Sequence, residues 1–378
     1  MGDAVCAAAD GGSHRRLSAD APLLTEAATQ IHHCVVVLTC SNNKMRLALR
    51  NIILCTLPSA FIVCIVLEIF LRLSGYTPFY LDGRAFAVSP DSRIVYELRP
   101  GFRGLYAGVP ISINSHGFRG GEPADDGAEP VARIAIVGDS VAFGQGVRDD
   151  ETLAVQLRKT LERTVHSGVE VTNLGVPAYN TCQEYWSFKE RSPEPKPQVV
   201  VLVYVSNDTD PPTLQVIGDR VISADTKPGR FGDIMAALRK QSFFYNLVWS
   251  RWQIVKVGPP HLDRYQRVLR KNFADSSAGW QMSKGCLKDM AILTRSRGIR
   301  LIVIPFPVLG GLDQKPYTFD RYVQTVCHAA LAEGAECLDV VPVLAQPDIH
   351  LTVSAVEQHP SGQVYNRVAK RIAEMLRP

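Results

Sequence analysis

The sequence predicts an α/β protein: a three-layer α/β/α sandwich around a mainly parallel sheet of about five strands, preceded by one N-terminal transmembrane helix. Short apolar runs that suit buried strands alternate with longer stretches that suit helices, which is typical of parallel sheets covered on both faces. A single long apolar segment lies near the N-terminus. The 378 residues are 46% hydrophobic and 21% charged, which excludes a disordered or coiled-coil chain.

The predicted strands and helices follow one another from residue 131 onwards. We expect strands at 132–137, 169–174, 198–205, 300–305 and 336–341. We expect helices at 151–166, 263–297, 317–333 and 361–376. Residues 131–378 are therefore assigned to the sandwich.

One stretch, residues 210–262, interrupts this alternation. It contains the paired Phe243 and Phe244 together with several proline and glycine residues. Because it follows the third strand, it lies on the side where open α/β sheets form their ligand crevice. It either shapes a substrate site or forms a lid, or it is a surface loop with its own small apolar cluster.

The apolar segment 52–71 has the length needed to cross a bilayer as a helix, and Glu68 is its single charge. A helix buried in a protein core would show a polar stripe, which is absent between Ile52 and Leu67. A cleaved signal peptide is the other alternative, but no small-residue cleavage site follows the segment. We therefore predict an uncleaved signal anchor at 45–73.

Basic residues just before the segment favour a cytoplasmic N-terminus. The predicted location is the inner (cytoplasmic) membrane, crossed once, with the part after Leu73 on the periplasmic or extracytoplasmic side. Residues 74–130 are interpreted as a small β-containing lead-in and linker. Residues 1–44 are interpreted as a disordered tail or a mis-assigned start, because Met45 stands directly before the anchor.

Four of the nine cysteines lie in the part that we expect to be exported. They are Cys182, Cys286, Cys327 and Cys337. Their spacing is unlike that of a zinc site, and an exported location permits disulfides. Cys327 and Cys337 would pair if their elements lie side by side, but the sequence leaves the disulfide state open.

The charges exclude one class of partner. Lys and Arg number 41 against 37 Asp and Glu, a net charge of +4 without a dense basic stripe, so we expect no nucleic-acid partner. No His and acidic residues show the spacing of metal ligands, so neither a metal nor another cofactor is expected.

The segment IAIVGDSVAFGQGV, residues 134–147, carries the first candidate residues. The strand runs into Gly138, Asp139 and Ser140, and the glycine lets the chain leave the strand sharply, so that Ser140 would be exposed at the crevice. Near the C-terminus, His359 precedes a predicted helix and is a candidate general base for Ser140. Gly175 and Asn207 follow the second and third strands. Their backbone N–H and side-chain amide, with the N–H of Ser140, would supply three donors to an oxyanion.

In this pattern the chain resembles the SGNH hydrolase superfamily, also called GDSL-like lipases and esterases. The four block residues match in order: Ser140, Gly175, Asn207 and His359. The upstream segments YELRPGFRG and INSHGFRG resemble lead-ins of membrane-anchored bacterial members. The resemblance implies a nucleophilic Ser, a His base, and an oxyanion hole formed by the Ser N–H, the Gly N–H and the Asn amide, with Asp139 in a supporting role.

Two positions depart from the family's pattern. The family usually has Gly two residues before the Asn, where this chain has Val205. It commonly has Asp three residues before the His, where this chain has Val356. The nearest carboxylate is Glu357, which we take as the catalytic acid, and Asp348 is a more distant candidate.

These features predict a membrane-anchored, exported serine hydrolase that cleaves an acyl or acetyl ester through an acyl-enzyme. The expected substrate is an ester-bearing small molecule, lipid or glycan, and the sequence does not choose among them or define an oligomeric state. One alternative is an O-acyltransferase of envelope polysaccharide that uses the same site. Another is a catalytically degenerate module that binds a glycan or a partner, which the two departures keep open.

Overall fold

The computed structural model describes residues 50–51, 54, 56–122, 132–164, 168–211, 214–217, 220–223, 230–257, 262–354 and 357–377. The chain divides into two compact units, Met1–Phe70 and Leu71–Pro378. The segment that we interpreted as a tail, 1–44, lies outside the described residues, as does most of the linker before residue 132.

Helix α2 (Leu57–Leu73) contains most of the predicted anchor. Its large apolar side chains are exposed, among them Phe61 and Phe70. Residues 52, 53 and 55 of the predicted span are not among those described. Within the described part of the chain, no helix combines the length and the apolar character that a membrane crossing requires.

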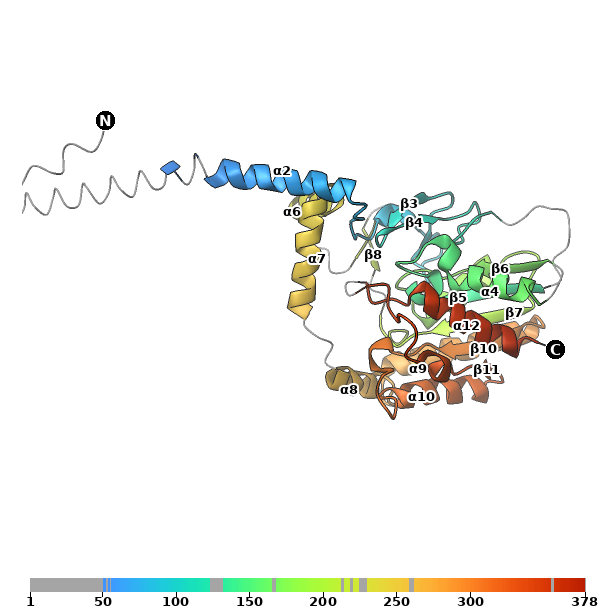
Figure 1. The fold of residues 1–378 in the computed structure, drawn as a ribbon. Coiled ribbons are helices and arrows are strands. Elements are labelled where there is room, and N and C mark those ends of the chain that lie inside the picture. Colours follow the sequence, from blue (N-terminus) through green and yellow to red (C-terminus); the bar gives the residue numbers. More distant parts are fainter. Residues whose placement is uncertain are drawn as a thin grey trace, which may run out of the picture. The chain divides into compact units, whose positions relative to one another are not determined.

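A five-stranded parallel sheet forms the centre of the larger unit (Figure 1). Its strands are β5 (Ala132–Gly138), β6 (Val169–Asn173), β7 (Val199–Tyr204), β10 (Arg300–Pro305) and β11 (Glu336–Cys337). They lie in the order β11-β10-β7-β5-β6, and every neighbouring pair is parallel. The predicted α/β class and parallel sheet are therefore confirmed, although β11 is shorter than expected.

Alternate side chains of the buried strands pack into two different cores. Ile134 and Ile136 point into the core on one face, which is shared with α4 (Leu153–Glu162) and α12 (Gly362–Met375). Ala135 and Val137 point into the core on the other face, which is shared with α9 (Ala278–Ser296) and α10 (Asp320–Ala332). Both faces of β5, β7 and β10 are buried, so these three strands read as continuous apolar runs rather than as an alternating pattern.

Two helices differ from the prediction. The stretch 263–297 forms two helices, α8 (Leu262–Asn272) and α9, because Ser277 ends the intervening turn and caps α9 by accepting the N–H of Trp280. Helix α5 (Thr181–Arg191) was missed, since its buried residues include several polar ones and give no apolar period. A capping box starts it: Asn180 accepts the N–H of Gln183, whose side chain accepts the N–H of Asn180.

The lead-in folds as two small antiparallel sheets that share a core with the sandwich. One pairs β1 (Phe86–Val88) with β2 (Tyr96–Leu98), and the other pairs β3 (Arg103–Tyr106) with β4 (Val109–Ser112). The ring of Tyr106 packs edge-on against Phe143, with 5.6 Å between centroids. The ring of Tyr96 packs in the same way against Tyr179, at 5.2 Å. The lead-in thus belongs to the same compact unit as the sheet.

The insertion after β7 contains a hairpin and two helices. The hairpin consists of β8 (Leu214–Ile217) and β9 (Arg220–Ser223), and the helices are α6 (Arg230–Gln241) and α7 (Phe243–Val257). The remaining short elements are η2 (Gly83–Ala85), α3 (Ser140–Phe143), η3 (Asp149–Glu151), η4 (Leu309–Gly311) and α11 (Val341–Leu344).

Two disulfides cross-link elements of the larger unit. Cys182 of α5 is bonded to Cys286 of α9, two neighbouring helices on one face of the sheet. Cys327 of α10 is bonded to Cys337 of β11. All four cysteines of the part that we expect to be exported are therefore paired.

Candidate active site

Three neighbouring strands end at one edge of the sheet, and the residues after them form the candidate site. β5, β6 and β7 are parallel, so the segments after Gly138, Asn173 and Tyr204 meet at their carboxyl ends. Gly138 has a φ of 153°, and a Cβ there would lie 2.7 Å from Cβ of Ala142 and 2.8 Å from the carbonyl O of Val203. Glycine is therefore required where the chain turns from β5 towards α3.

Ser140 is the first residue of α3 and lies next to His359. Its Oγ is 2.8 Å from Nε2 of the imidazole. Nδ1 of the same ring contacts Oε1 of Glu357, which also accepts the backbone N–H of His359 at 3.2 Å. The three side chains thus connect a hydroxyl, an imidazole and a carboxylate, which is the arrangement that lets a His remove the proton of a Ser.

A folded loop before α12 holds the imidazole in place. The N–H of Val353 donates to the carbonyl of His359 at 3.0 Å. Ser354 closes the loop, because its N–H donates to the carbonyl of Glu357 at 2.9 Å and its Oγ accepts the N–H of Glu357 at 3.0 Å. Ser361 then caps α12 through its Oγ. The loop therefore fixes both the His and the acid by backbone contacts.

Of the two candidate acids, Glu357 reaches the imidazole and Asp348 binds elsewhere. Asp348 contacts the guanidinium of Arg367, and its side chain is 67% exposed. Val356, at the position where the resemblance implies an acid, lies outside the described residues. The carboxylate beside the ring therefore stands only two residues before the His in the sequence.

The ion pair shifts the pKa values of both partners. Burial alone would lower the pKa of His359, but the hydrogen bond and the charge of Glu357, with the charge of Asp139, outweigh it and raise that pKa above 6.5. Burial alone would raise the pKa of Glu357, but its bonds to His359 and Gln145 lower it. The site therefore favours an ionised Glu357 and stabilises a protonated imidazole.

Gln145 is a buried residue of the site that the sequence reasoning missed. Its Nε2 donates to Oε2 of Glu357 at 3.2 Å and lies 3.3 Å from Nδ1 of His359. The next residue, Gly146, has a φ of 82°, and a Cβ there would lie 2.6 Å from Cγ of Glu357. The amide thus holds the second carboxylate oxygen, and the glycine makes room for the side chain. The sequence GQG gives no hint of a partner 212 positions away.

Asp139 connects the nucleophile to the loop after β7. Its carboxylate accepts the N–H of Val141 at 2.8 Å and caps α3. Its Oδ2 lies 3.1 Å from Oγ of Ser140 and accepts Nδ2 of Asn207 at 3.4 Å. Burial raises the pKa of Asp139. The Asn207 amide is therefore brought to the same side of the sheet as Ser140, as the sequence predicts for the two residues.

Gly175 lies at the same edge, but its N–H already has a partner. It donates to Oδ1 of Asn173 at 2.9 Å. A Cβ on Gly175 would lie 2.2 Å from the backbone N of Phe143, so close packing against α3 is a sufficient reason for the glycine. To stabilise an oxyanion, this N–H would have to break its hydrogen bond to the Asn173 side chain and donate to the ligand instead.

Two further carboxyl groups are buried near the site. Burial and neighbouring carboxyl groups raise the pKa values of Glu184, in α5, and of Asp208 well above their usual range. Asp208 accepts the N–H of Val205 at 3.1 Å and so closes the loop that carries Asn207. Val205 is thus held by a side chain of its own loop. Among the described residues, neither carboxyl oxygen of Glu184 has a hydrogen-bond partner.

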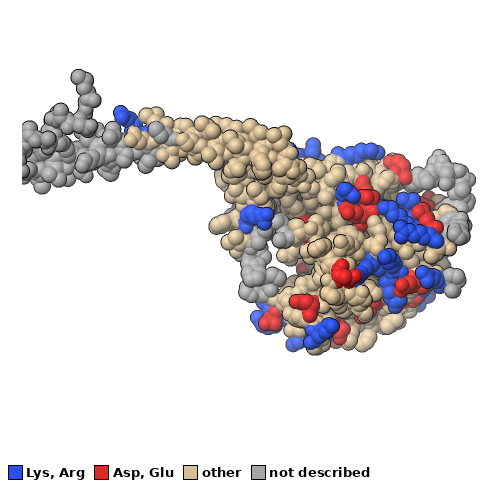
Figure 2. Space-filling model, in the orientation of Figure 1, with Lys and Arg blue, Asp and Glu red and all other residues tan. Residues whose placement is uncertain are grey.

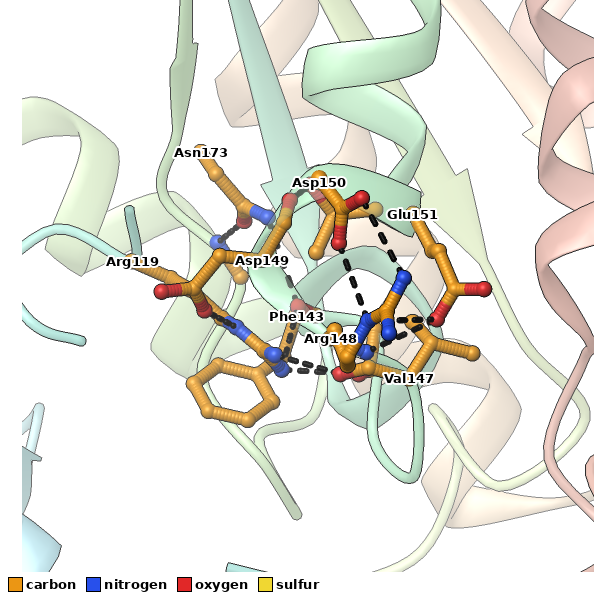
Figure 3. Close-up of polar contacts among 11 residues, drawn as sticks. Arg119, Phe143, Val147, Arg148, Asp149, Asp150, Glu151 and Asn173 are labelled. Atoms are coloured by element: carbon orange, nitrogen blue, oxygen red, sulfur yellow. Dashed lines mark hydrogen bonds and ion pairs between the residues drawn. The ribbon is translucent and has the colours of Figure 1, made fainter. Parts of the chain in front are cut away.

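Arg119 of the lead-in supports the chain behind the nucleophile (Figure 3). Its fully buried guanidinium donates to the carbonyls of Phe143 at 3.1 Å, Gly144 at 2.7 Å and Val147 at 2.6 Å. It also contacts Oδ1 of Asp149 at 3.2 Å. One side chain therefore fixes the segment that leads from α3 to Gln145 and beyond. In the described ranges, no group of three or more His, Cys, Asp or Glu residues is arranged to hold a metal ion.

Comparison with known proteins finds likeness only among solved structures. No protein-family model matches the chain, and no curated protein matches it. A catalytic variant of an acetylxylan esterase from Geobacillus stearothermophilus has a TM-score of 0.40 and 13% identity, over 65% of this chain and 94% of that one. A lipase/acylhydrolase from Enterococcus faecalis has a TM-score of 0.38 and 14% identity, over 65% and 95%. A protein assigned to the lipolytic G-D-S-L family from Desulfitobacterium hafniense DCB-2 has a TM-score of 0.37 and 17% identity, over 65% and 99%. At these values nothing about activity follows from the likeness.

The ion pair predicts the titration of His359. In the wild-type protein its pKa should lie above 6.5, and in Glu357→Gln it should fall, because the neutral amide no longer favours the charged ring. NMR titration of the imidazole measures both values. Asp348→Asn is the matched control and should leave the titration unchanged. A pKa that does not move in Glu357→Gln, or that moves in Asp348→Asn, contradicts the assignment of the acid.

Proposed function

We propose that this chain is a membrane-anchored, exported serine hydrolase that cleaves an ester bond through an acyl-enzyme on Ser140. The observation that carries the proposal is the 2.8 Å contact between Oγ of Ser140 and Nε2 of His359, with Glu357 on the far side of the ring. A hydroxyl is a weak nucleophile at neutral pH, and an adjacent base that is itself oriented by a carboxylate is what activates it.

In the acylation step, Nε2 of His359 takes the proton of Ser140 as Oγ attacks the ester carbonyl. The Nδ1–H donates to Glu357, which fixes the tautomer that leaves Nε2 free to accept and stabilises the imidazolium that forms. The tetrahedral intermediate then collapses, and the imidazolium gives its proton to the departing alkoxide. In the second step, a water loses its proton to the same nitrogen and attacks the acyl carbon. The bond between the acyl carbon and Oγ then breaks, and the imidazolium returns its proton to Oγ, which releases the acid and restores Ser140 and His359.

The hydroxyl of Ser140 has two acceptors and one proton. It lies 3.1 Å from Oδ2 of Asp139 and 2.8 Å from Nε2 of His359, and only donation to the ring leads to reaction. The amide of Asn207 also bonds to that aspartate oxygen. Asp139 therefore acts as a positioning residue that keeps the nucleophile and the amide side by side before a substrate arrives.

The oxyanion of the intermediate needs donors beside Ser140. The Asn207 amide and the backbone N–H of Ser140 are the two donors that we assign first, because both belong to segments joined through Asp139. Gly175 supplies the third donor once its N–H leaves Oδ1 of Asn173. On this account the oxyanion hole is completed on ligand binding.

The assembled residues favour catalysis over the binding-module alternative. A module without turnover needs no hydroxyl aligned with an imidazole. The carboxylate that is missing at position 356, where the chain has Val, is supplied at this site by Glu357. An O-acyltransferase would share the acyl-enzyme and differ only in its acceptor. The neighbouring segments do not favour one acceptor over another, so hydrolysis by water is the function that we assign.

Two observations support the anchored and exported part of the proposal. The apolar segment 52–71 has one charge and the length of a membrane span. The four cysteines of the larger unit form two disulfides, which persist in oxidising compartments and are rare in the cytosol.

The activity test uses the full chain and p-nitrophenyl acetate. Ser140→Ala and His359→Ala should each lower kcat/KM by about 10³-fold or more, because the nucleophile and its base act as one unit. Asp348→Asn, a change at an exposed residue bound to Arg367, should keep the wild-type rate constant. An inactive wild-type protein, or an active Ser140→Ala variant, would falsify the proposal. If the acyl group passes to added glycan acceptors in preference to water, the protein is a transferase and the assignment as a hydrolase is wrong.

The export test follows the thiols in bacterial cells that express the whole chain. Alkylation of denatured protein before and after reduction should show that Cys182, Cys286, Cys327 and Cys337 react only after reduction. A control without residues 45–73 should stay in the cytoplasm and react before reduction. If the complete chain also reacts before reduction, the larger unit is not exported.

A further inference from the structure

Helices α6 and α7 of the insertion expose a set of large apolar side chains. On α6 they are spaced three and four residues apart and on α7 four and three apart, so each set lies along one face of its helix. The set consists of Phe231, Ile234, Leu238, Val248, Trp252 and Val255, and we call it the α6–α7 apolar surface. Phe231 is 76% exposed and Trp252 is 64% exposed. Two neighbouring helices with such faces indicate a surface that meets an apolar partner.

The opposite side of α7 is fixed to the body of the protein. Asn246 is fully buried, and its side chain accepts the Tyr76 hydroxyl at 3.0 Å and the N–H of Phe79 at 2.9 Å. Its Nδ2 donates to the carbonyls of Phe79 at 2.7 Å and Arg239 at 3.0 Å. On α6, Nζ of Lys240 pairs with Asp82 at 3.1 Å. The exposed faces therefore belong to helices that are held in place by their other sides.

The charge of this segment points to an anionic partner. Residues 230–257 contain five basic residues and one acidic residue, a net charge of +4 that equals the net charge of the whole chain. Arg251 is exposed beside Trp252, and the guanidinium of Arg239 lies 4.6 Å from the Trp249 ring centroid. In the view of Figure 2, the surface over α6 and α7 is mostly uncharged, with few basic side chains, while acidic and basic side chains gather over the sandwich. A second copy of the chain would bring an equal positive charge against the surface, which opposes dimerisation through it.

Arg72, the first residue after the predicted membrane span, contacts the junction between α6 and α7. Arg72 follows that span directly, and its Nη2 donates to the carbonyl of Gln241 at 2.5 Å. Its guanidinium carbon lies 4.5 Å from the centroid of the Phe243 ring. These two partners are the last residue of α6 and the first of α7. If the span crosses the bilayer, Arg72 lies at the membrane interface, and so does the junction between the two helices.

From these observations we infer that the α6–α7 apolar surface docks on the lipid surface of an anionic membrane. The apolar side chains enter the boundary between headgroups and acyl chains, with Trp252 at the level that indole rings favour. Arg251, which is exposed beside Trp252, binds anionic headgroups. The larger unit is then held at the bilayer by two contacts, the anchor and this surface. The inference rests on the proposed anchor but not on the proposed chemistry.

The test places the full chain in vesicles of phosphatidylcholine and phosphatidylglycerol whose acyl chains carry bromine, which quenches nearby tryptophan. Wild-type fluorescence should be quenched, and Trp252→Phe should lose most of that quenching. Trp280→Phe is the matched control, because Trp280 is 2% exposed in the core and should contribute no quenching. Vesicles of phosphatidylcholine alone should give weaker quenching, since the anionic headgroups are missing.

Flotation of the same samples tests the membrane anchor separately from the docking of the α6–α7 apolar surface. A chain that does not float with the vesicles refutes the anchor and, with it, the docking inference. A chain that floats but whose quenching is the same in Trp252→Phe as in the wild type refutes the docking alone. Crosslinking between copies through the α6–α7 apolar surface, without quenching, would show that a second copy covers it and would also overturn the inference. In every variant, hydrolysis of p-nitrophenyl acetate by detergent-solubilised protein should be unchanged, so a failure of the proposed activity remains distinguishable.

Discussion

The buried carboxylate of Asp139 is the contact on which the arrangement of the site depends. It caps α3 through the N–H of Val141, lies beside the hydroxyl of Ser140 and accepts the amide of Asn207. These bonds join the end of β5 to the loop after β7. Because parallel strands place their carboxyl ends at one edge, a single side chain can hold both segments. The catalytic chemistry that we propose follows from this constraint, since the nucleophile and the Asn207 amide are fixed before substrate binds.

A second buried polar side chain extends the same support to the lead-in. The Arg119 guanidinium donates to three backbone carbonyls at and after the end of α3, among them those of Phe143 and Val147. Loop carbonyls that face the interior need donors, and an arginine supplies several in a fixed geometry. This explains why the lead-in, which looks like a separate module in the sequence, shares a core with the sandwich. Gln145, at the end of the supported segment, then reaches Glu357 and completes the orientation of His359.

The central strands could be predicted because each is a buried apolar run, and the candidate residues after the strands were assigned by their resemblance to a known four-block pattern. Glu357 could be named as the nearest carboxylate, but only the loop closed by Ser354 explains why it reaches the ring. Gln145 and Arg119 could not be predicted, because their partners lie far away in the sequence and no local pattern marks them. Helix α5 was missed because polar side chains such as Glu184 are buried in it. Cys182 lies in that helix, so its disulfide with Cys286 could not be predicted for the same reason.

The central claim is that Ser140 is a nucleophile activated by His359. The most direct measurement is mass spectrometry of the full chain after reaction with a fluorophosphonate, which phosphonylates only an activated serine. We expect one adduct, located by peptide mapping on Ser140, and its loss in His359→Ala although the serine is still present. An unlabelled wild-type protein, an adduct on another residue, or equal labelling in His359→Ala would contradict it.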